Sequence, residues 1–302
     1  MLPDPFRMPV ITPEQNNANG SLHTGLHCQV VYTRGVMKRI NITCLLTCTL
    51  SIFANICIAN GDDSLDLIDR LRQTMAINIE DVINAQFPGA APVKGFSVVN
   101  PYTPQASESV QQRKTLAWRE TQVCAIRFTD TLRVAYELRG FETSALATSA
   151  GFIVTHHGSC GSCSTLHDLS VYLGTPDLTT PARECARRFG LSRKQQCFEK
   201  IVGFTSYCAE SWAYNARNTK QACLGTCVSD YGLLNLLFHR YPGTAVTQSG
   251  QLRPCLQCDE DKSGPGFEYS AGRTRRNSGI ESAIPRPEAE ISSVDHTRYF
   301  HE

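Results

Sequence analysis

Apolar and polar residues alternate in the middle of the chain. Cys124, Ile126 and Phe128 face one way in an extended run, and Arg127 and Thr129 face the other, which is the pattern of a half-buried strand. The run 132–139 alternates in the same way after a short polar stretch at 129–131. The two runs predict a β-hairpin, and the apolar run 152–155 predicts a third, buried strand.

Helical spacing of apolar residues occurs on both sides of these strands. Ser64 can cap a first helix in which Leu65, Ile68 and Leu71 share a face, and the spacing continues toward Pro88. The stretch 88–112, rich in Pro, Ser and Gly, predicts a long loop. Further helices are expected at 144–150, 165–173, from 180 onward, within 192–219, within 231–241 and at 263–279. The predicted fold class is therefore α+β, with a small antiparallel sheet packed with helices and a mostly helical second half.

The N-terminal part has the pattern of a secretory signal peptide. Met37-Lys38-Arg39 is basic, residues 40–58 are apolar apart from Thr, Ser, Asn and Cys, and Cys57-Ile58-Ala59 is a small-x-small cleavage site. We expect translation to begin at Met37, so that residues 1–36 are a mis-assigned upstream extension and residues 37–59 are the signal. An uncleaved signal anchor is the alternative, since roughly 20 apolar residues can span a bilayer.

Composition indicates one ordinary domain in the mature protein. With 41% hydrophobic and 19% charged residues, the chain can bury a core, and we expect a single domain at 60–285 followed by a C-terminal tail at 286–302. The net charge of +1 gives no general attraction to nucleic acid or anionic membrane. We therefore expect no nucleic-acid partner, and membrane contact only through an uncleaved signal. The oligomeric state stays open.

Cysteine is the unusual residue type. Of 14 cysteines, four precede Asn60 and ten follow it, and an even number behind a signal peptide predicts disulfides and a secreted or periplasmic location. Cys185 and Cys197 flank an expected turn at Gly190, so we expect them to pair. The other pairings cannot be assigned from the sequence.

A C-x-x-C motif joins the third strand to a helix. In Cys160-Gly161-Ser162-Cys163, the first cysteine is expected beside a helix N-terminus, which would lower its pKa. The motif resembles the active-site turn of thioredoxin-like proteins. That resemblance implies thiol–disulfide exchange, with Cys160 attacking and Cys163 resolving. The alternative is that both cysteines belong to a structural disulfide framework.

The same motif also offers metal ligands. His156, His157 and His167 lie near it in sequence, and Cys255-x-x-Cys258 supplies two further thiols. An oxidising compartment favours disulfides, so we expect no metal unless residues 37–59 are not a signal.

Polar residue types that are rare elsewhere suggest a small-molecule pocket. On the expected 263–279 helix, Arg273 and Arg276 share a face, and paired guanidiniums commonly hold carboxylates or phosphates. We expect His157 or Asp168 to transfer a proton in such a pocket. The other expected substrate-binding residues are Trp212, Asn215, Asp259, Glu260 and Asn277.

Three functions remain open from the sequence. The first is an exported disulfide-rich protein, a candidate enzyme that acts on a small anionic substrate without a cofactor. The second is a thiol–disulfide oxidoreductase using Cys160 and Cys163, and the third is a non-catalytic binding or structural module. The sequence contains no nucleophile elbow, phosphate-binding loop, dinucleotide fingerprint or His-Glu-x-x-His motif, so it identifies no reaction.

Overall fold

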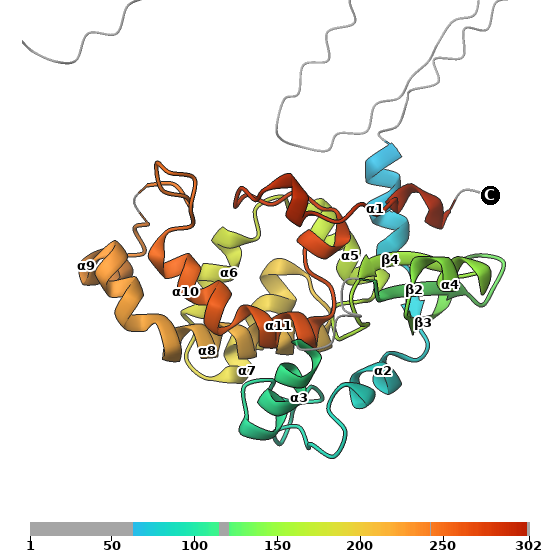
Figure 1. Cartoon of the computed structure of the whole chain (residues 1–302), viewed down its shortest axis with the longest axis horizontal. Coiled ribbons are helices and arrows are strands. Elements are labelled where there is room, and N and C mark those ends of the chain that lie inside the picture. The colour runs from blue at the N-terminus through green and yellow to red at the C-terminus, as the bar shows by residue number, and fades with distance from the viewer. Residues whose placement is uncertain (1–62, 115–120, 242, 301–302) are drawn as a thin grey trace, which may run out of the picture. The chain divides into compact units, whose positions relative to one another are not determined.

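The computed structural model describes residues 63–114, 121–241 and 243–300, which Figure 1 draws as a coloured ribbon. The expected upstream extension, signal peptide and cleavage site lie outside the described residues. The described residues form an α+β structure with a four-stranded sheet and five disulfides, which confirms the predicted fold class. In these ranges, no helix combines the length and the apolar character needed to cross a bilayer.

The sheet has the strand order β1-β3-β2-β4. The β2–β3 and β2–β4 pairs are antiparallel, and the two-residue β1 lies parallel to β3. The predicted hairpin and third strand are therefore present, whereas β1 interrupts a stretch for which the sequence predicts helix. The strands are β1 (Met75–Ala76), β2 (Val123–Phe128), β3 (Ala135–Phe141) and β4 (Ile153–His157).

The hairpin turn is wider than the sequence predicts. Leu132 is 80% exposed and Val134 45% exposed, so they do not continue the buried side of β3. The Asp130 carboxylate instead accepts hydrogen bonds from the backbone N–H groups of Val134 and Ala135, at 3.2 and 2.6 Å. These bonds close the turn and delay the strand until Ala135.

Both faces of β2 are buried, and this places the sheet between two apolar clusters. Cys124 and Ile126 belong to the main core, together with residues of α5 (Leu166–Gly174). The opposite face packs against α4 (Ser144–Ser149), whose first turn is capped by the Thr143 hydroxyl. The buried members of this second cluster are Val123, Ala125, Ala147 and Phe152.

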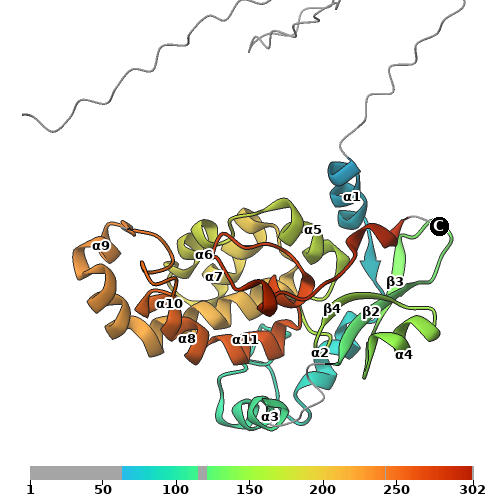
Figure 2. The same ribbon diagram turned by 45° about the horizontal axis from the view of Figure 1, so that its top comes forward.

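The second half of the chain packs around one long helix. This helix, α8 (Ser206–Tyr231), has 26 residues, and the Thr205 hydroxyl caps its first turn. Five α-helices contact it, and Figure 2 shows α10 and α11 lying along it. The five are α6 (Thr179–Ala186), α7 (Leu191–Cys197), α9 (Leu233–Leu237), α10 (Pro254–Lys262) and α11 (Gly264–Ala271). The other α-helices of the described ranges are α1 (Asp63–Arg72), α2 (Ile79–Gln86) and α3 (Pro104–Lys114), together with α4 and α5.

Two of the expected elements are wrong. The stretch predicted as a loop at 88–112 contains most of α3, in which Ala106 and Val110 are buried four residues apart. The helix expected at 263–279 ends at Ala271, because Gly272 has a φ of +72°. Within the rest of the expected span, up to residue 279, the structure has a 3₁₀ turn at Arg276–Ser278.

Five disulfides join residues that are 12 to 45 positions apart in the sequence. The expected Cys185–Cys197 bond is present and joins α6 to α7. Each such bond typically contributes about 2–4 kcal/mol to stability. The other four are Cys124–Cys160, Cys163–Cys208, Cys223–Cys258 and Cys227–Cys255.

The C-terminal segment docks on the sheet. Tyr299 is fully buried, and its carbonyl accepts a hydrogen bond from Arg133 Nη1 at 2.8 Å. The Phe300 ring lies 5.8 Å from the Phe128 ring and 3.9 Å from the Arg70 guanidinium. This end of the expected tail is therefore part of the packed structure.

Candidate functional site

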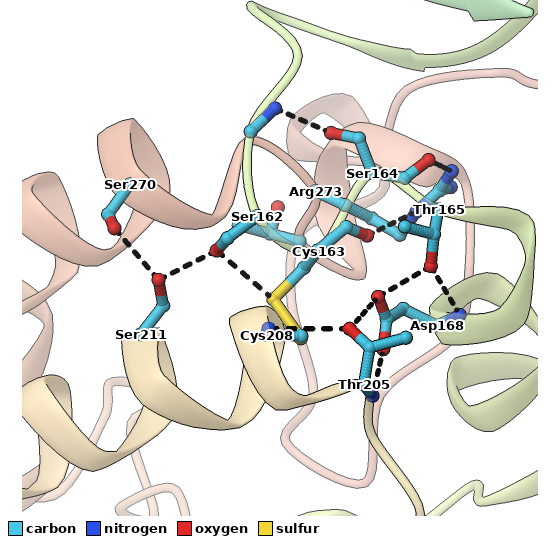
Figure 3. The surroundings of a disulfide bond; sticks show 12 residues. Ser162, Cys163, Ser164, Thr165, Asp168, Thr205, Cys208, Ser211, Ser270 and Arg273 are labelled. Carbon is cyan, nitrogen blue, oxygen red and sulfur yellow. Dashed lines mark hydrogen bonds between the residues drawn. A yellow bond between two sulfur atoms is a disulfide. The ribbon is translucent and has the colours of Figure 1, made fainter. Parts of the chain in front are cut away.

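The C-x-x-C motif lies in a buried turn between β4 and α5. Residues 160–165 of the turn are all buried. The turn packs against the segment 270–273 and against the start of α8, residues 205–211. We call these three pieces the junction, and Figure 3 shows the side chains that connect them.

Two glycines allow backbones to touch in the junction. The N–H groups of Ser162 and Cys163 donate to the carbonyls of Ser270 and Ala271, at 3.0 and 2.8 Å. A Cβ on Gly161 would lie 2.6 Å from the backbone N of Gly272, and a Cβ on Gly272 would lie 2.5 Å from that of Gly161. The crossing therefore excludes any side chain at either position.

The two cysteines of the motif do not bond to each other. Cys160 pairs with Cys124 of β2, and Cys163 pairs with Cys208 of α8. Cys160 is 8% exposed and Cys163 is fully buried. Cys160 also lies six residues before the first residue of α5, away from the expected helix N-terminus. The predicted Cys160–Cys163 exchange pair is therefore corrected to two separate cross-links.

The zinc alternative is corrected by the same pairing. Cys255 and Cys258 form disulfides with Cys227 and Cys223 on α8, so they are not free thiols. Across the described residues, no group of three or more His, Cys, Asp or Glu side chains is placed to hold a metal.

Asp168 connects the first turns of α5 and α8. Its carboxylate accepts hydrogen bonds from the Thr165 hydroxyl at 2.6 Å and from the Thr205 hydroxyl and N–H at 2.8 Å each. Asp168 is fully buried. Burial raises the pKa of its carboxyl, and the bonds from Thr165 and Thr205 oppose that rise. The residue expected to transfer a proton thus joins the two threonines that cap α5 and α8.

Arg273 is fully buried and is held by the turn itself. Its Nε donates to the Cys163 carbonyl at 3.1 Å and its Nη2 to the Ser164 carbonyl at 3.2 Å. Its Nη1 donates to the Thr155 carbonyl at 3.0 Å and to the Ser278 hydroxyl at 3.3 Å. Burial lowers the pKa of this guanidinium. Every nitrogen of the side chain therefore has a protein acceptor.

Arg276 does not join Arg273 in a shared site. It lies beyond the end of α11 and pairs with Glu260 at 3.0 Å and Glu290 at 3.2 Å, with 38% of its side chain exposed. Glu260 also pairs with Arg286. The predicted anion clamp of two arginines on one helix face is wrong, because Gly272 ends the helix before either arginine.

His156 and Ser164 complete the hydrogen bonding of the turn. The His156 ring is fully buried, with Nδ1 2.8 Å from the His157 carbonyl and Nε2 2.8 Å from the Ser164 hydroxyl. Burial and the charge of Arg273 hold the pKa of His156 well below its usual range. In the neutral ring Nδ1 must carry the proton, because a carbonyl only accepts. Ser164 Oγ also accepts from the Gly161 N–H at 2.7 Å.

Among the described residues, no hydrogen bond or ion pair joins His157 to Asp168, the two residues of which one was expected to transfer a proton. A separate chain of buried hydroxyls, Ser162–Ser211–Ser270, links the turn to α8 and α11 through contacts of 2.7 and 2.8 Å.

The remaining expected pocket residues also make internal contacts. The Trp212 ring packs 5.7 Å from Phe204 and 4.7 Å from Phe267. Asn215 Oδ1 accepts from the Tyr102 hydroxyl at 2.9 Å. Asp259 accepts from the Thr219 hydroxyl, and burial raises the pKa of its carboxyl. Asn277 accepts from the Thr274 N–H and donates to the Gly272 carbonyl, both at 2.8 Å.

Sequence reasoning missed the residues that hold the junction together. The missed residues are Ser164, Thr165, Thr205, Ser211, Ser270 and Gly272. Two of them could have been found, because threonine is a common residue at the start of a helix. Thr165 and Thr205 cap α5 and α8, and each hydroxyl accepts a hydrogen bond from the N–H three residues later. Nothing local to Arg273 or Gly272 indicates the turn that they contact more than 100 residues earlier.

Comparison with known proteins assigns no activity. A family of unknown function (DUF8771) matches residues 191–294, which extend from α7 almost to the C-terminus. That region contains Arg273 and α8 but not the sheet or the C-x-x-C turn. No match was found among curated proteins or among solved structures.

Proposed function

We propose that this protein is an exported, disulfide-stabilised binding module, and that its junction is a structural framework instead of a catalytic centre. The observation that carries the proposal is the pairing of Cys160 and Cys163 with two different elements. The signal-like pattern at 37–59 and the five disulfides support an oxidising compartment.

Catalysis would need groups that a substrate can reach. Thiol exchange needs an accessible sulfur with a neighbouring partner cysteine, and Cys163 has no exposed surface. General acid–base transfer needs a group within hydrogen-bond distance of the substrate, and Asp168 is fully buried and hydrogen-bonded to two threonines. The buried polar groups instead satisfy one another and fix the position of three chain segments.

An insulin-reduction assay tests the non-catalytic role. We expect the native protein to give no turnover above that of the double variant Cys124→Ala/Cys160→Ala, which removes the bond without leaving a free thiol. Turnover by the native protein that this variant abolishes would contradict the proposal.

N-terminal sequencing tests export separately. We expect protein recovered outside the cytosol to begin within a few residues of Asn60. A cytosolic product that begins at Met1 would contradict export.

A second candidate role is binding of a small anion, at a place that differs from the predicted one. Arg183 lines an open cavity of about 180 Å³ with Tyr231, Tyr241 and Thr244. Its guanidinium lies 4.2 Å from the centre of the Tyr241 ring and 3.5 Å from the Tyr231 hydroxyl. Asp177 also lines this cavity. Among the described residues Arg183 makes no ion pair, so the Nε and Nη1 groups of its guanidinium can still bind a carboxylate.

Thermal-shift measurements with small carboxylates and phosphate test this second role. Stabilisation of the native protein that Arg183→Lys reduces would support it, because an ammonium cannot reproduce bidentate geometry. Equal shifts for the native protein and for Arg183→Ala would contradict it.

A further inference from the structure

Helix α9 exposes an unusual number of large apolar side chains. Leu233, Leu234, Leu237 and Phe238 are 57%, 67%, 59% and 67% exposed. Their spacing places them on one face of the helical turn, and Leu236 on the other side is only half-buried. Clustered exposed apolar residues of this size are typical of a contact surface.

The base of this helix is fixed by covalent bonds. Cys223–Cys258 and Cys227–Cys255 tie the last turns of α8 to α10. Just beyond them, Arg253 pairs with Asp230 at 2.7 Å. Figures 1 and 2 both draw α9 at the end of the helical half that is farthest from the sheet. We call residues 231–241 the tip; its apolar face is presented on a rigid stem.

Two arginines lie at the tip. The exposed Arg240 follows the apolar residues, and its guanidinium lies 6.0 Å from the centre of the Phe238 ring. The Arg183 guanidinium of α6 lies 4.2 Å from the centre of the Tyr241 ring. Among the described residues neither arginine makes an ion pair, so the tip presents positive charge beside its apolar face.

We propose that the tip docks on an anionic lipid surface, with the apolar face of α9 inserted at the interface and Arg183 and Arg240 facing lipid headgroups. Apolar residues beside cations are the combination that interfacial membrane binding uses. A second copy of this chain is disfavoured as the occupant, because pairing two tips would bring Arg183 and Arg240 of both copies together.

The inference rests on the proposed binding role and names its partner. The two proposals can be tested independently. The insulin-reduction assay tests the non-catalytic role of the junction, and vesicle binding tests the tip, whatever the chemistry of Cys160 and Cys163.

Co-sedimentation with vesicles tests the inference. The folded protein, recovered with its disulfides intact from the compartment where it accumulates, is mixed with phosphatidylcholine vesicles with or without phosphatidylglycerol. We expect binding to the anionic vesicles, weaker binding to the neutral ones, and a further loss as salt screens the charges. The triple variant Leu234→Ser/Leu237→Ser/Phe238→Ser should lose about tenfold or more in partitioning.

Leu132→Ser is the matched control, because Leu132 is also a highly exposed leucine but lies in the β2–β3 turn. It should bind the anionic vesicles like the native protein. Three outcomes would overturn the inference: no vesicle binding, equal binding to neutral vesicles, or equal binding by the triple variant. A sedimentation coefficient that shows self-association lost in the triple variant would assign the tip to a second copy instead.

Discussion

The junction and the tip use polar and apolar residues in opposite ways. In the junction, the charged groups of Arg273 and Asp168 are fully buried and fully hydrogen-bonded within the protein. In the tip, four large apolar side chains are mostly exposed. Arginine and aspartate, which suggest a catalytic or binding site in a sequence, here hold three chain segments of the junction together. The exposed surface of the tip is apolar instead.

The largest effect is expected from removing the buried guanidinium. Arg273→Met should lower the free energy of unfolding by about 3–5 kcal/mol, because it leaves three buried carbonyls without a donor. Arg273→Lys should lose less, since an ammonium keeps the charge and some of the donors. Chemical denaturation measures both; a loss below that of an ordinary surface substitution for Arg273→Met would contradict the structural role of this residue.

Removing a junction disulfide should come next. Cys163→Ala/Cys208→Ala should cost about 2–4 kcal/mol in the free energy of unfolding. Its matched control, Cys227→Ala/Cys255→Ala, should cost less, because Cys223–Cys258 still joins the same two helices. Thermal melts compare the two, and an equal or larger loss in the control would show that the junction is not the more tightly built region.

The stability of the protein should depend on pH through two histidines that feel the charge of Arg273, His296 and His156. Burial, with the charge of Arg273, lowers the pKa of His296 from 6.5 to about 4. Between those values the unfolded chain binds a proton that the folded chain does not, so the contribution to stability is present above about pH 6.5 and is lost as the pH falls toward 4. His156 shifts in the same direction.

The variant His296→Gln tests this pH effect. It keeps a donor for the Ser278 carbonyl, 2.7 Å from His296 Nε2, and removes the titration. The melting temperature of the native protein should fall more steeply than that of the variant over this pH range. Parallel curves would rule out His296 as a source of the slope.

The smallest effect is expected at Arg276, three residues from Arg273. Its ion pairs with Glu260 and Glu290 are partly exposed, so Arg276→Ala should cost less than about 1 kcal/mol. Arg276→Lys should restore nearly all of that loss. A cost equal to that of Arg273→Met would show that exposure does not distinguish these two arginines.

Local patterns predicted the elements whose partners lie nearby in sequence. The alternation in β2, the apolar spacing in α5 and the Cys185–Cys197 bond across 12 residues all depend on short-range chemistry. β1 was missed because a strand of two residues is too short to show an alternation of apolar and polar residues. Its partner strand, β3, lies about 60 residues later in the chain. α3 was missed because its sequence is mostly polar; Ala106 and Val110 are buried.

The candidate site was less predictable, since its roles depend on long-range packing. The sequence placed Cys160, Asp168 and Arg273 among the important residues, but a functional group has the same signature in sequence whether it faces a substrate or a carbonyl. Arg273 contacts carbonyls at 155, 163 and 164, and only the crossing of Gly161 and Gly272 brings these together. The end of α11 at Gly272 also separates Arg276 from Arg273, so that Arg276 pairs with Glu260 and Glu290 instead.

Mass mapping of disulfide-linked peptides from the unreduced native protein is the most direct test that the C-x-x-C motif is structural. We predict peptides that join Cys124 to Cys160 and Cys163 to Cys208, both resistant to mild reductant. A Cys160–Cys163 bond, or a selectively reducible pair of thiols at these two positions, would contradict the account.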